Sequence, residues 1–153
     1  MNDENQKSLS EKGRAALAYL QRGNCPIPVG NNKRPLISSW EQFQTSLPTK
    51  EQVIAWWTQN PNANIALICG HGGMVVLDID VKSNPANQEI ADKIAAAMKG
   101  KAPVVRTPSG GIHIHLRETD TKSKSAYLGT LGEFRASGLY VLVPPSDGYT
   151  YEE

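Results

Sequence analysis

Residues 75–82, VVLDIDVK, constrain the fold of this chain more than any other stretch. The apolar residues of the segment favour β-structure, which predicts a strand, yet Asp78 and Asp80 interrupt it. Because side chains alternate along a strand, the two carboxylates point the same way, about 6.5–7 Å apart along the chain. Like charges that close repel each other, and partial burial strengthens the repulsion. We therefore expect a divalent cation, or a nearby lysine or arginine, to compensate for them.

Two carboxylates at this spacing have a functional and a plain structural interpretation. On a rigid strand they can hold one or two Mg²⁺ or Mn²⁺ ions, which are hard cations that prefer oxygen ligands. Paired ions of this kind activate an attacking hydroxyl and stabilise the leaving oxygen in phosphoryl transfer. In the plain interpretation both aspartates lie at the end of the strand and are simply solvated. The motif by itself leaves both interpretations open.

The composition is that of a globular chain with nearly balanced charge. Its 153 residues suffice for one domain, or for two small lobes that share a core. No apolar run approaches the ~20 residues of a membrane span, and the polar N-terminus does not resemble a signal peptide. Cys25 and Cys69 lie in no metal-binding spacing, which indicates a reduced, cytoplasmic setting. The formal net charge of +1 argues against a domain that holds nucleic acid by charge alone.

Periodicity and turn residues predict a mixture of helices and strands. We expect a flexible tail over residues 1–8 and a polar loop over 118–131, and we expect Ser10 and Thr49 to cap helices. Hairpins outnumber strand–helix–strand crossovers, so the predicted fold class is α+β. The chain stops as its last strand begins, which predicts that it is part of a longer polypeptide. The predicted helices cover 9–23, 48–61 and 84–100, and the predicted strands cover 25–30, 64–70, 74–81, 103–107 and 112–117, with two more within 132–146 and another from 147.

The segment RTPSGGIHIHLR, residues 106–117, combines a tight turn with alternating histidines. The turn at 109–111 can offer backbone N–H groups to a phosphate. His113 and His115 alternate with apolar residues, so both histidines lie on one face of the predicted strand. An ordinary glycine hairpin with two half-buried histidines is the plain alternative. The combination of the turn, a histidine and the flanking arginines favours an anion site.

Two further charged groups are candidates for the same chemistry. In GEFRASG, Glu133 and Arg135 share one face of a strand, so Glu133 can be a third metal ligand and Arg135 can pair with a phosphate or a carboxylate. A surface ion pair of little energetic consequence is the plain alternative, and it is favoured in isolation. In NNKRPL, Lys33 or Arg34 can reach a phosphate from a proline-stiffened loop, although a solvated loop charge is the simpler interpretation.

Taken in order, these stretches resemble the primase–polymerase (prim-pol) domain of the archaeo-eukaryotic primase superfamily. The resemblance runs from about residue 15 to residue 151. The segment VVLDIDV is similar to the first catalytic motif of the family, TPSGGIHIHLR to the second and GEFRASGLYVLVPPS to the third. The resemblance implies an N-terminal α/β unit packed with a sheet module like an RNA-recognition motif, with the active site in the cleft between them.

The resemblance also implies roles for individual residues. Asp78 and Asp80 match the metal-binding pair, and Glu133 falls where an acid, often Asp, completes the metal site. His113 matches a histidine that contacts the phosphates of the incoming nucleotide. The residues implied as further nucleotide contacts are Lys33, Ser109, Gly110, Gly111 and Arg135.

Residues 9–153 are thus expected to form a template-directed DNA primase/polymerase domain from a replication protein of a plasmid, phage or mobile element. The expected substrates are (d)NTPs and a single-stranded DNA template, the expected cofactor is Mg²⁺ or Mn²⁺, and a helicase or DNA-binding segment is expected beyond the domain. A competing interpretation takes His113 and His115 as the metal ligands of a rolling-circle nuclease, with Tyr127 or Tyr140 attacking DNA. A third is a non-catalytic nucleic-acid-binding module.

Overall fold

A six-stranded antiparallel sheet forms one layer of the computed structural model, which describes residues 3–119 and 124–152. Its strand order is β6-β7-β3-β5-β4-β9, so that β3 lies between β7 and β5 near the middle. The hairpin predicted around the turn at 109–111 is confirmed as the pair β4 and β5. The strands are β3 (Met74–Ile79), β4 (Val104–Arg106), β5 (Ile112–Arg117), β6 (Ala126–Tyr127), β7 (Gly132–Arg135) and β9 (Thr150–Tyr151).

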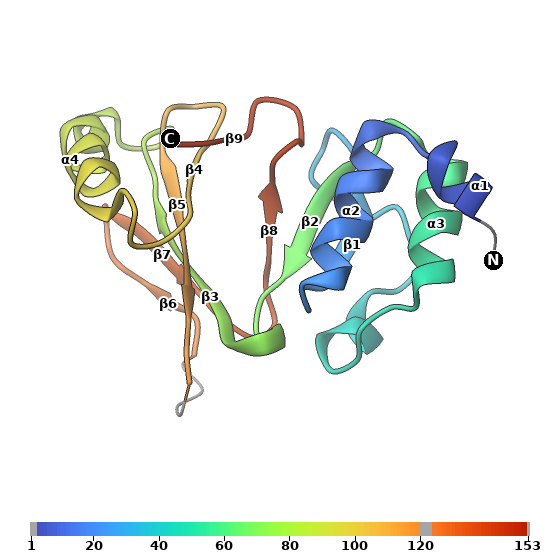
Figure 1. The fold of residues 1–153 in the computed structure, drawn as a ribbon. Helices are drawn as coiled ribbons and strands as arrows, with labels where there is room; N and C mark the ends of the chain where they lie inside the picture. Colours follow the sequence, from blue (N-terminus) through green and yellow to red (C-terminus); the bar gives the residue numbers. More distant parts are fainter. Residues whose placement is uncertain (1–2, 120–123, 153) are drawn as a thin grey trace.

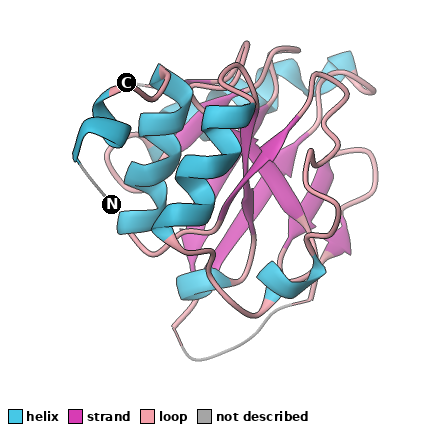
Figure 2. Cartoon of the chain, turned by 90° about the vertical axis from the view of Figure 1, so that its right-hand side faces the viewer, coloured by secondary structure: helices cyan, strands magenta, loops and turns pink. Residues whose placement is uncertain are grey.

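A second, three-stranded antiparallel sheet has the order β1-β2-β8, from β1 (Pro26–Val29), β2 (Asn64–Ile68) and β8 (Tyr140–Val143). The prolines of β1 suit its place at the edge of this sheet, because they donate no ladder hydrogen bonds. Helices α2 (Glu11–Gln21) and α3 (Lys50–Gln59) pack together over this sheet, and Figure 2 views the molecule from this helical side. Trp57 is fully buried between them and the sheet, and its indole N–H donates to the Ala63 carbonyl.

The two faces of the six-stranded sheet have different neighbours. Helix α4 (Gln88–Met98) covers the outer face, where it packs on Leu77 and Ile79 of β3 and on the apolar residues of β5. On the inner face, Met74 and Val76 join the core of the three-stranded unit. The alternation of β3 therefore places Asp78 on the inner face, just past the apolar contact. Figure 1 shows the two sheets diverging from a common base near the start of β3.

Strands β2 and β3 do not pair with each other, although only the predicted GHGG turn separates them. The turn forms a short 3-10 helix, η2 (His71–Gly73), which carries the chain from the three-stranded sheet into the six-stranded one. A side chain at Gly73 would collide with the backbone carbonyl of Glu118, and the φ angle of Gly73 is 79°. Glycine is thus needed where the two layers meet.

The α+β class is confirmed, and the structure contains two short elements that the sequence did not predict. Residues Asp3–Lys7 form a short helix, α1, where a flexible tail is expected. Its end is fastened by a hydrogen bond from the Ser8 hydroxyl to Asn5 and by burial of Leu9 in the core. Within the expected loop, β6 pairs with β7. The remaining short helices are η1 (Glu41–Gln44) and η3 (Pro85–Asn87).

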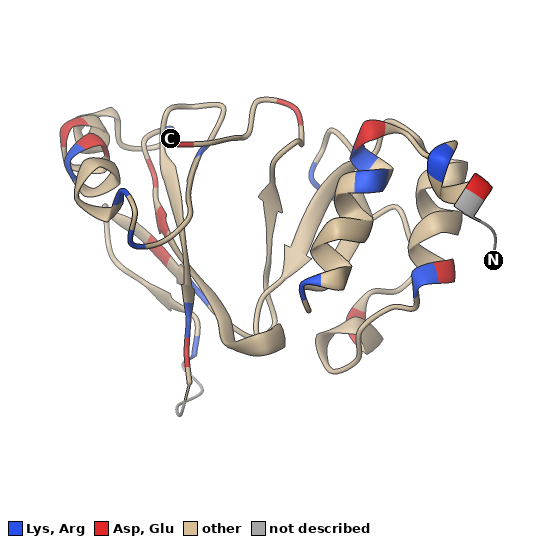
Figure 3. Ribbon diagram, in the orientation of Figure 1, with Lys and Arg blue, Asp and Glu red and all other residues tan. Residues whose placement is uncertain are grey.

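Both predicted N-caps are confirmed. The Ser10 hydroxyl accepts from the backbone N–H of Gly13, and Thr49 forms a reciprocal capping box with Gln52. Lysine and arginine residues are spread over both layers together with acidic ones, as Figure 3 shows, which agrees with the net charge of +1. None of the helices in the described part of the chain has the length and apolar character that a membrane crossing requires.

Candidate active site

A row of three ionisable side chains crosses the inner face of the six-stranded sheet. In the strand register, Asp78 of β3 lies opposite His113 of β5 on one side and opposite Glu133 of β7 on the other. Side chains directly opposite each other in neighbouring antiparallel strands share a face and lie about 4.5–5.5 Å apart at Cβ. Three residues from separate motifs are thus brought together by strand pairing.

Arg135 compensates for the charge of these carboxylates. Its Nε lies 3.4 Å from Oδ2 of Asp78, and its Nη2 lies 3.1 Å from Oε2 of Glu133. On the other side, Nε2 of His113 lies 3.5 Å from Oδ1 of Asp78. The contact from Arg135 Nε is an ion pair without hydrogen-bond geometry, because that atom has no hydrogen-bond partner among the described residues. The guanidinium of Arg135 therefore meets the need for positive charge that the sequence raises, while the imidazole of His113 contacts Asp78 from the opposite side.

The protonation state of Asp78 follows from these neighbours. Burial raises the pKa of its carboxyl, while contact with His113, and then the charge of Arg135, lowers it. The lowering effects prevail, so the pKa of Asp78 lies below its ordinary value of 3.8. Asp78 is consequently an anion at neutral pH, as a ligand for a hard cation must be.

Asp80 differs from Asp78 in its surroundings. Strand β3 ends at Ile79, and Asp80 follows it with its Oδ1 accepting from the backbone N–H of Ser83 at 3.1 Å. The two aspartates nevertheless line the same cavity of about 660 Å³, and Glu133 lines it with them. The residues proposed as metal ligands therefore open into one space, although only Asp78 lies within the strand.

The cavity belongs to a cleft between the two sheets. A neighbouring cavity of about 350 Å³ shares Asp78, His113, Arg135, Lys33 and Tyr149 with it. The ring centroid of Tyr149 lies 6.2 Å from that of His113. Lys33 comes from the loop after β1, so the cleft receives cations from both structural units.

Aromatic residues line the cleft in addition to the predicted nucleotide contacts. Trp40 and Tyr140 pack edge to face at 5.1 Å, and the Tyr140 hydroxyl donates to the backbone carbonyl of Lys33 at 2.8 Å. Tyr149, in the segment GYTY at residues 148–151, lines both cavities of the cleft. Tyr127, which is 85% exposed, lies on the rim of the larger cavity.

Only part of the turn predicted to bind a phosphate lines the cleft. Ser109 lines the larger cavity, but Gly110 and Gly111 are not among its lining residues. The N–H of Gly110 donates to the Thr107 carbonyl, so it is used within the turn. A side chain at Gly111 would lie 2.5 Å from the carbonyl oxygen of Ile79. Gly111 therefore allows the turn to lie against the end of β3, whereas Gly110 lies against the Gln88 side chain of α4.

The two histidines of β5 open into different spaces. His113 lines both cavities of the cleft, whereas His115 lines a separate cavity on the same face of the sheet. A rolling-circle nuclease needs both histidines on one metal ion. The separation of their surroundings therefore argues against that interpretation.

The donor chemistry of the cleft suits a hard divalent cation, since three carboxylates line one cavity. The side chains as placed do not yet form a coordination shell: within the described residues, no three His, Cys, Asp or Glu side chains are grouped closely enough to hold a metal ion. The guanidinium of Arg135 contacts both Asp78 and Glu133, which accounts for this spacing. The three carboxylates are suitable ligands for a divalent cation. Arg135 must move before Asp78 and Glu133 can bind one.

Comparison with known proteins gives a family for the chain. A search of curated proteins finds no match. Residues 16–152 match the family model described as "Bifunctional DNA primase/polymerase, N-terminal". This match covers most of the 153 residues, and it includes both sheets and every residue of the row on β3, β5 and β7. Family members generally use divalent metals and act on nucleotides and a DNA template. The chain belongs to the Prim-Pol family of bifunctional DNA primase/polymerase domains.

Proposed function

We propose that residues 9–153 form a template-directed nucleotidyltransferase domain, which incorporates (d)NTPs on a single-stranded DNA template in the replication of a plasmid, phage or mobile element. The observation that carries this proposal is the row formed by Glu133, Asp78 and His113 on the inner face of the six-stranded sheet. It supplies carboxylates for metal binding beside a histidine for phosphate contact, in a cleft open to both structural units.

In this proposal Asp78, Asp80 and Glu133 hold the Mg²⁺ or Mn²⁺ ions. A divalent cation bound there supplies Lewis-acid stabilisation of the charge that develops on the phosphates. Arg135 neutralises Asp78 and Glu133 when it pairs with them. When a cation neutralises the carboxylates instead, the guanidinium is released to bind a phosphate, for which its planar donors are well suited.

The remaining residues of the cleft would bind and orient the nucleotide. His113 is buried, and its Nδ1 has no hydrogen-bond partner among the described residues. Lys33 and Ser109 face the same cavity from two different loops. Together with Arg135 they would hold the triphosphate, since an imidazole, an ammonium and a hydroxyl can all donate to phosphate oxygens. Gly110 and Gly111 would act by shaping the turn that presents Ser109.

The decisive experiment measures primer extension and de novo priming with Mn²⁺ or Mg²⁺ in the wild type, Asp78→Asn and Asp80→Asn. We expect both variants to lose incorporation while circular dichroism shows that they remain folded. Glu89→Gln is the matched control, because it also replaces a carboxylate by an amide but lies exposed on α4, where it pairs with Lys93. Full activity in either aspartate variant would overturn the metal assignment.

A second pair of variants distinguishes this proposal from nuclease chemistry. We expect His113→Ala to raise the nucleotide KM or to lower incorporation strongly, and His115→Ala to do much less, because only His113 lines the cleft. Equal and severe losses, together with strand nicking and a covalent adduct of DNA to a tyrosine, would support the rolling-circle interpretation instead. A folded wild type with no metal-dependent incorporation would indicate a non-catalytic binding module.

A further inference from the structure

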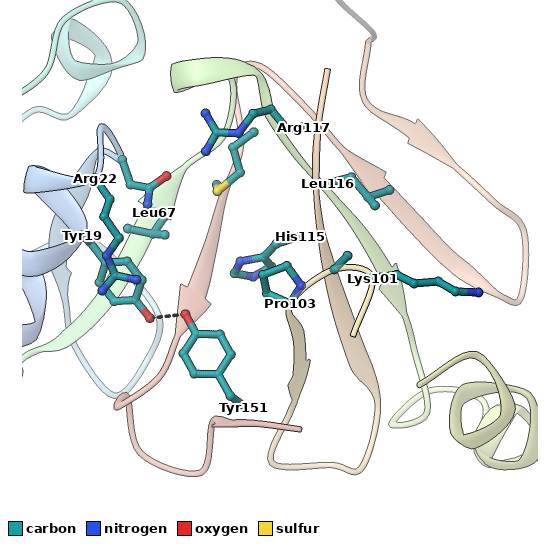
Figure 4. Close-up of a pocket in the computed structure, with 12 residues that line it drawn as sticks. Tyr19, Arg22, Leu67, Lys101, Pro103, His115, Leu116, Arg117 and Tyr151 are labelled. Atoms are coloured by element: carbon teal, nitrogen blue, oxygen red, sulfur yellow. Dashed lines mark hydrogen bonds between the residues drawn. The ribbon is translucent and has the colours of Figure 1, made fainter. Parts of the chain in front are cut away.

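A separate cavity of about 610 Å³ lies between the two structural units, which are the three-stranded sheet with α2 and α3 and the six-stranded sheet with α4. It shares no lining residue with the cavities of the candidate active site, and we call it the second cavity. Figure 4 shows its walls, which come from the end of α2, from β5, from the segment before β4 and from β9. His115 lies on its wall, so the histidine that the proposed reaction does not use has a defined location.

The walls of this cavity are cationic. Arg22 enters from α2 and Arg117 from β5, and Figure 4 shows their guanidinium groups on different sides of the space. Lys101 adds a third cation at the rim, where its side chain extends outward. Among the described residues that line the cavity, none is acidic. Three cations without an acidic partner in the same cavity favour an anionic ligand.

His115 adds a polar group that is buried and without a partner. Its Nε2 is inaccessible to solvent and has no hydrogen-bond partner among the described residues. An unpaired buried nitrogen is costly, so such groups in native proteins call for an explanation. A ligand atom that displaces the atoms covering this nitrogen and exchanges a hydrogen bond with it would provide one. The ring is directed toward the space between Arg22 and Tyr151 in Figure 4.

Tyr151 gives the cavity an aromatic wall whose position is fixed by hydrogen bonds. The Tyr19 hydroxyl donates to the Pro144 carbonyl at 2.6 Å, so it accepts the hydroxyl hydrogen of Tyr151, also at 2.6 Å. The guanidinium carbon of Arg22 lies 5.1 Å from the Tyr19 ring centroid, which orients the arginine as well. Tyr151 remains 43% exposed, and its ring is therefore available for stacking.

We propose that this cavity is a second nucleotide-binding site, in which Arg22 and Arg117 hold a phosphate, His115 exchanges a hydrogen bond with the ligand, and Tyr151 packs against the base. A nucleotide combines the two properties that the walls demand, a phosphate anion and a flat aromatic ring. The bound nucleotide is either a free nucleotide or one unit of a single strand. The proposal goes beyond the function proposed for the cleft, because the cavity contains none of its candidate metal ligands.

Strand β5 connects the two sites. His113 and His115 are two residues apart on one face, a spacing of about 6.5–7 Å along the strand. One histidine lines the cleft and the other lines the second cavity. A ligand in the second cavity is therefore close enough to the candidate active site to belong to the same bound strand.

The test measures binding in EDTA, so that metal-dependent binding in the cleft does not contribute. The probes are thymidine 5′-monophosphate, followed by the NMR signals of the histidine rings, and fluorescein-labelled oligothymidylate, followed by anisotropy at low salt. Arg22→Glu reverses one exposed charge of the cavity. Lys50→Glu is the matched control, because it makes the same charge change at an exposed residue of α3 that lines neither the cleft nor the second cavity.

We expect Arg22→Glu to weaken oligothymidylate binding about tenfold or more, and Lys50→Glu to weaken it less than about twofold. Binding of the monophosphate that shifts the His115 signal would identify a free nucleotide as sufficient, whereas binding of the oligonucleotide alone would identify a strand as the source. Tyr151→Leu, which retains an apolar wall, should weaken either probe by loss of stacking. Equal effects of Arg22→Glu and Lys50→Glu, or no saturable binding of either probe by the wild type, would overturn the proposal. This test measures binding and not catalysis. Its result can therefore be distinguished from a failure of the function proposed for the cleft, which the incorporation assay tests.

Discussion

The half-buried imidazole of His115 makes the stability of this domain depend on pH. Burial, followed by the charge of His113, lowers the pKa of His115 from 6.5 to about 4. The other charged groups around its cavity, Arg22, Lys101 and Arg117, are also cations, and Tyr19 and Tyr151 are neutral phenols. The folded protein therefore binds a proton at His115 less readily than the unfolded chain does.

The sign and size of the effect follow from this difference in pKa. Well above pH 6.5 the imidazole is neutral in both states, and the folded protein has its full stability. As the pH drops below about 6.5, the unfolded chain binds a proton at this histidine while the folded protein does not, so the free energy of unfolding falls. Each unit of pKa difference corresponds to about 1.4 kcal/mol, and about 2 kcal/mol should be lost between pH 7 and pH 5. Protonation of Asp78 lowers the stability only at more acidic pH, because the pKa of its carboxyl lies below 3.8.

Urea denaturation of the wild type and of His115→Gln at both pH values measures this loss. Glutamine keeps a polar side chain but cannot titrate, so its free energy of unfolding should fall by about 2 kcal/mol less than that of the wild type over the same interval. The absolute stability of the variant at pH 7 does not matter for this comparison. Parallel losses in the two proteins, or an NMR titration that places the pKa of His115 near 6.5, would refute the reasoning.

Substitutions at four positions test individual contacts by urea denaturation, together with the incorporation assay for Gly132. Ser146→Ala should cost about 1–3 kcal/mol, because the buried hydroxyl both donates to the carbonyl and accepts from the N–H of Ile65; Ser146→Thr should retain part of this. Gly132→Ala should destabilise the fold and lower incorporation together, since its side chain would collide with the backbone carbonyl of Asp78; a neutral result would contradict the close strand approach. Asp78→Asn should lower the free energy of unfolding by about 1–3 kcal/mol and Asp80→Asn by much less, because only the former loses an ion pair with Arg135; equal changes would contradict the ion-pair geometry.

Local sequence signals predicted the helices and the hairpin. The cap at Ser10 and the capping box at Thr49 depend on residues only three positions away, and both are formed as predicted. The turn at 109–111 likewise joins two strands that pair with each other. Each of these features is decided by neighbours in the chain, so alternation and turn residues are sufficient to recognise them.

Features that depend on distant pairing were not predicted. The strands on either side of the GHGG turn enter different sheets, although Met74 and Val76 of β3 share one apolar core with Ile65 and Leu67 of β2. The cavity around His115 is formed by residues as far apart as Tyr19 and Tyr151. No spacing in the sequence records that meeting, in which the Tyr19 hydroxyl of α2 and the Tyr151 hydroxyl of β9 share a hydrogen bond across the two structural units.

The difference between Asp78 and Asp80 shows where strand periodicity stops being informative. In the sequence the two are equivalent members of an alternating pair, and their mutual repulsion is the expected difficulty. In the structure Asp78 lies between Glu133 and His113 and contacts Arg135, while Asp80 lies past the strand and bonds to the next turn. The cross-strand neighbours, rather than the other aspartate, therefore govern the charge of Asp78. Because Arg135 contacts Asp78 and Glu133 at once, the metal site proposed above requires this guanidinium to leave both carboxylates.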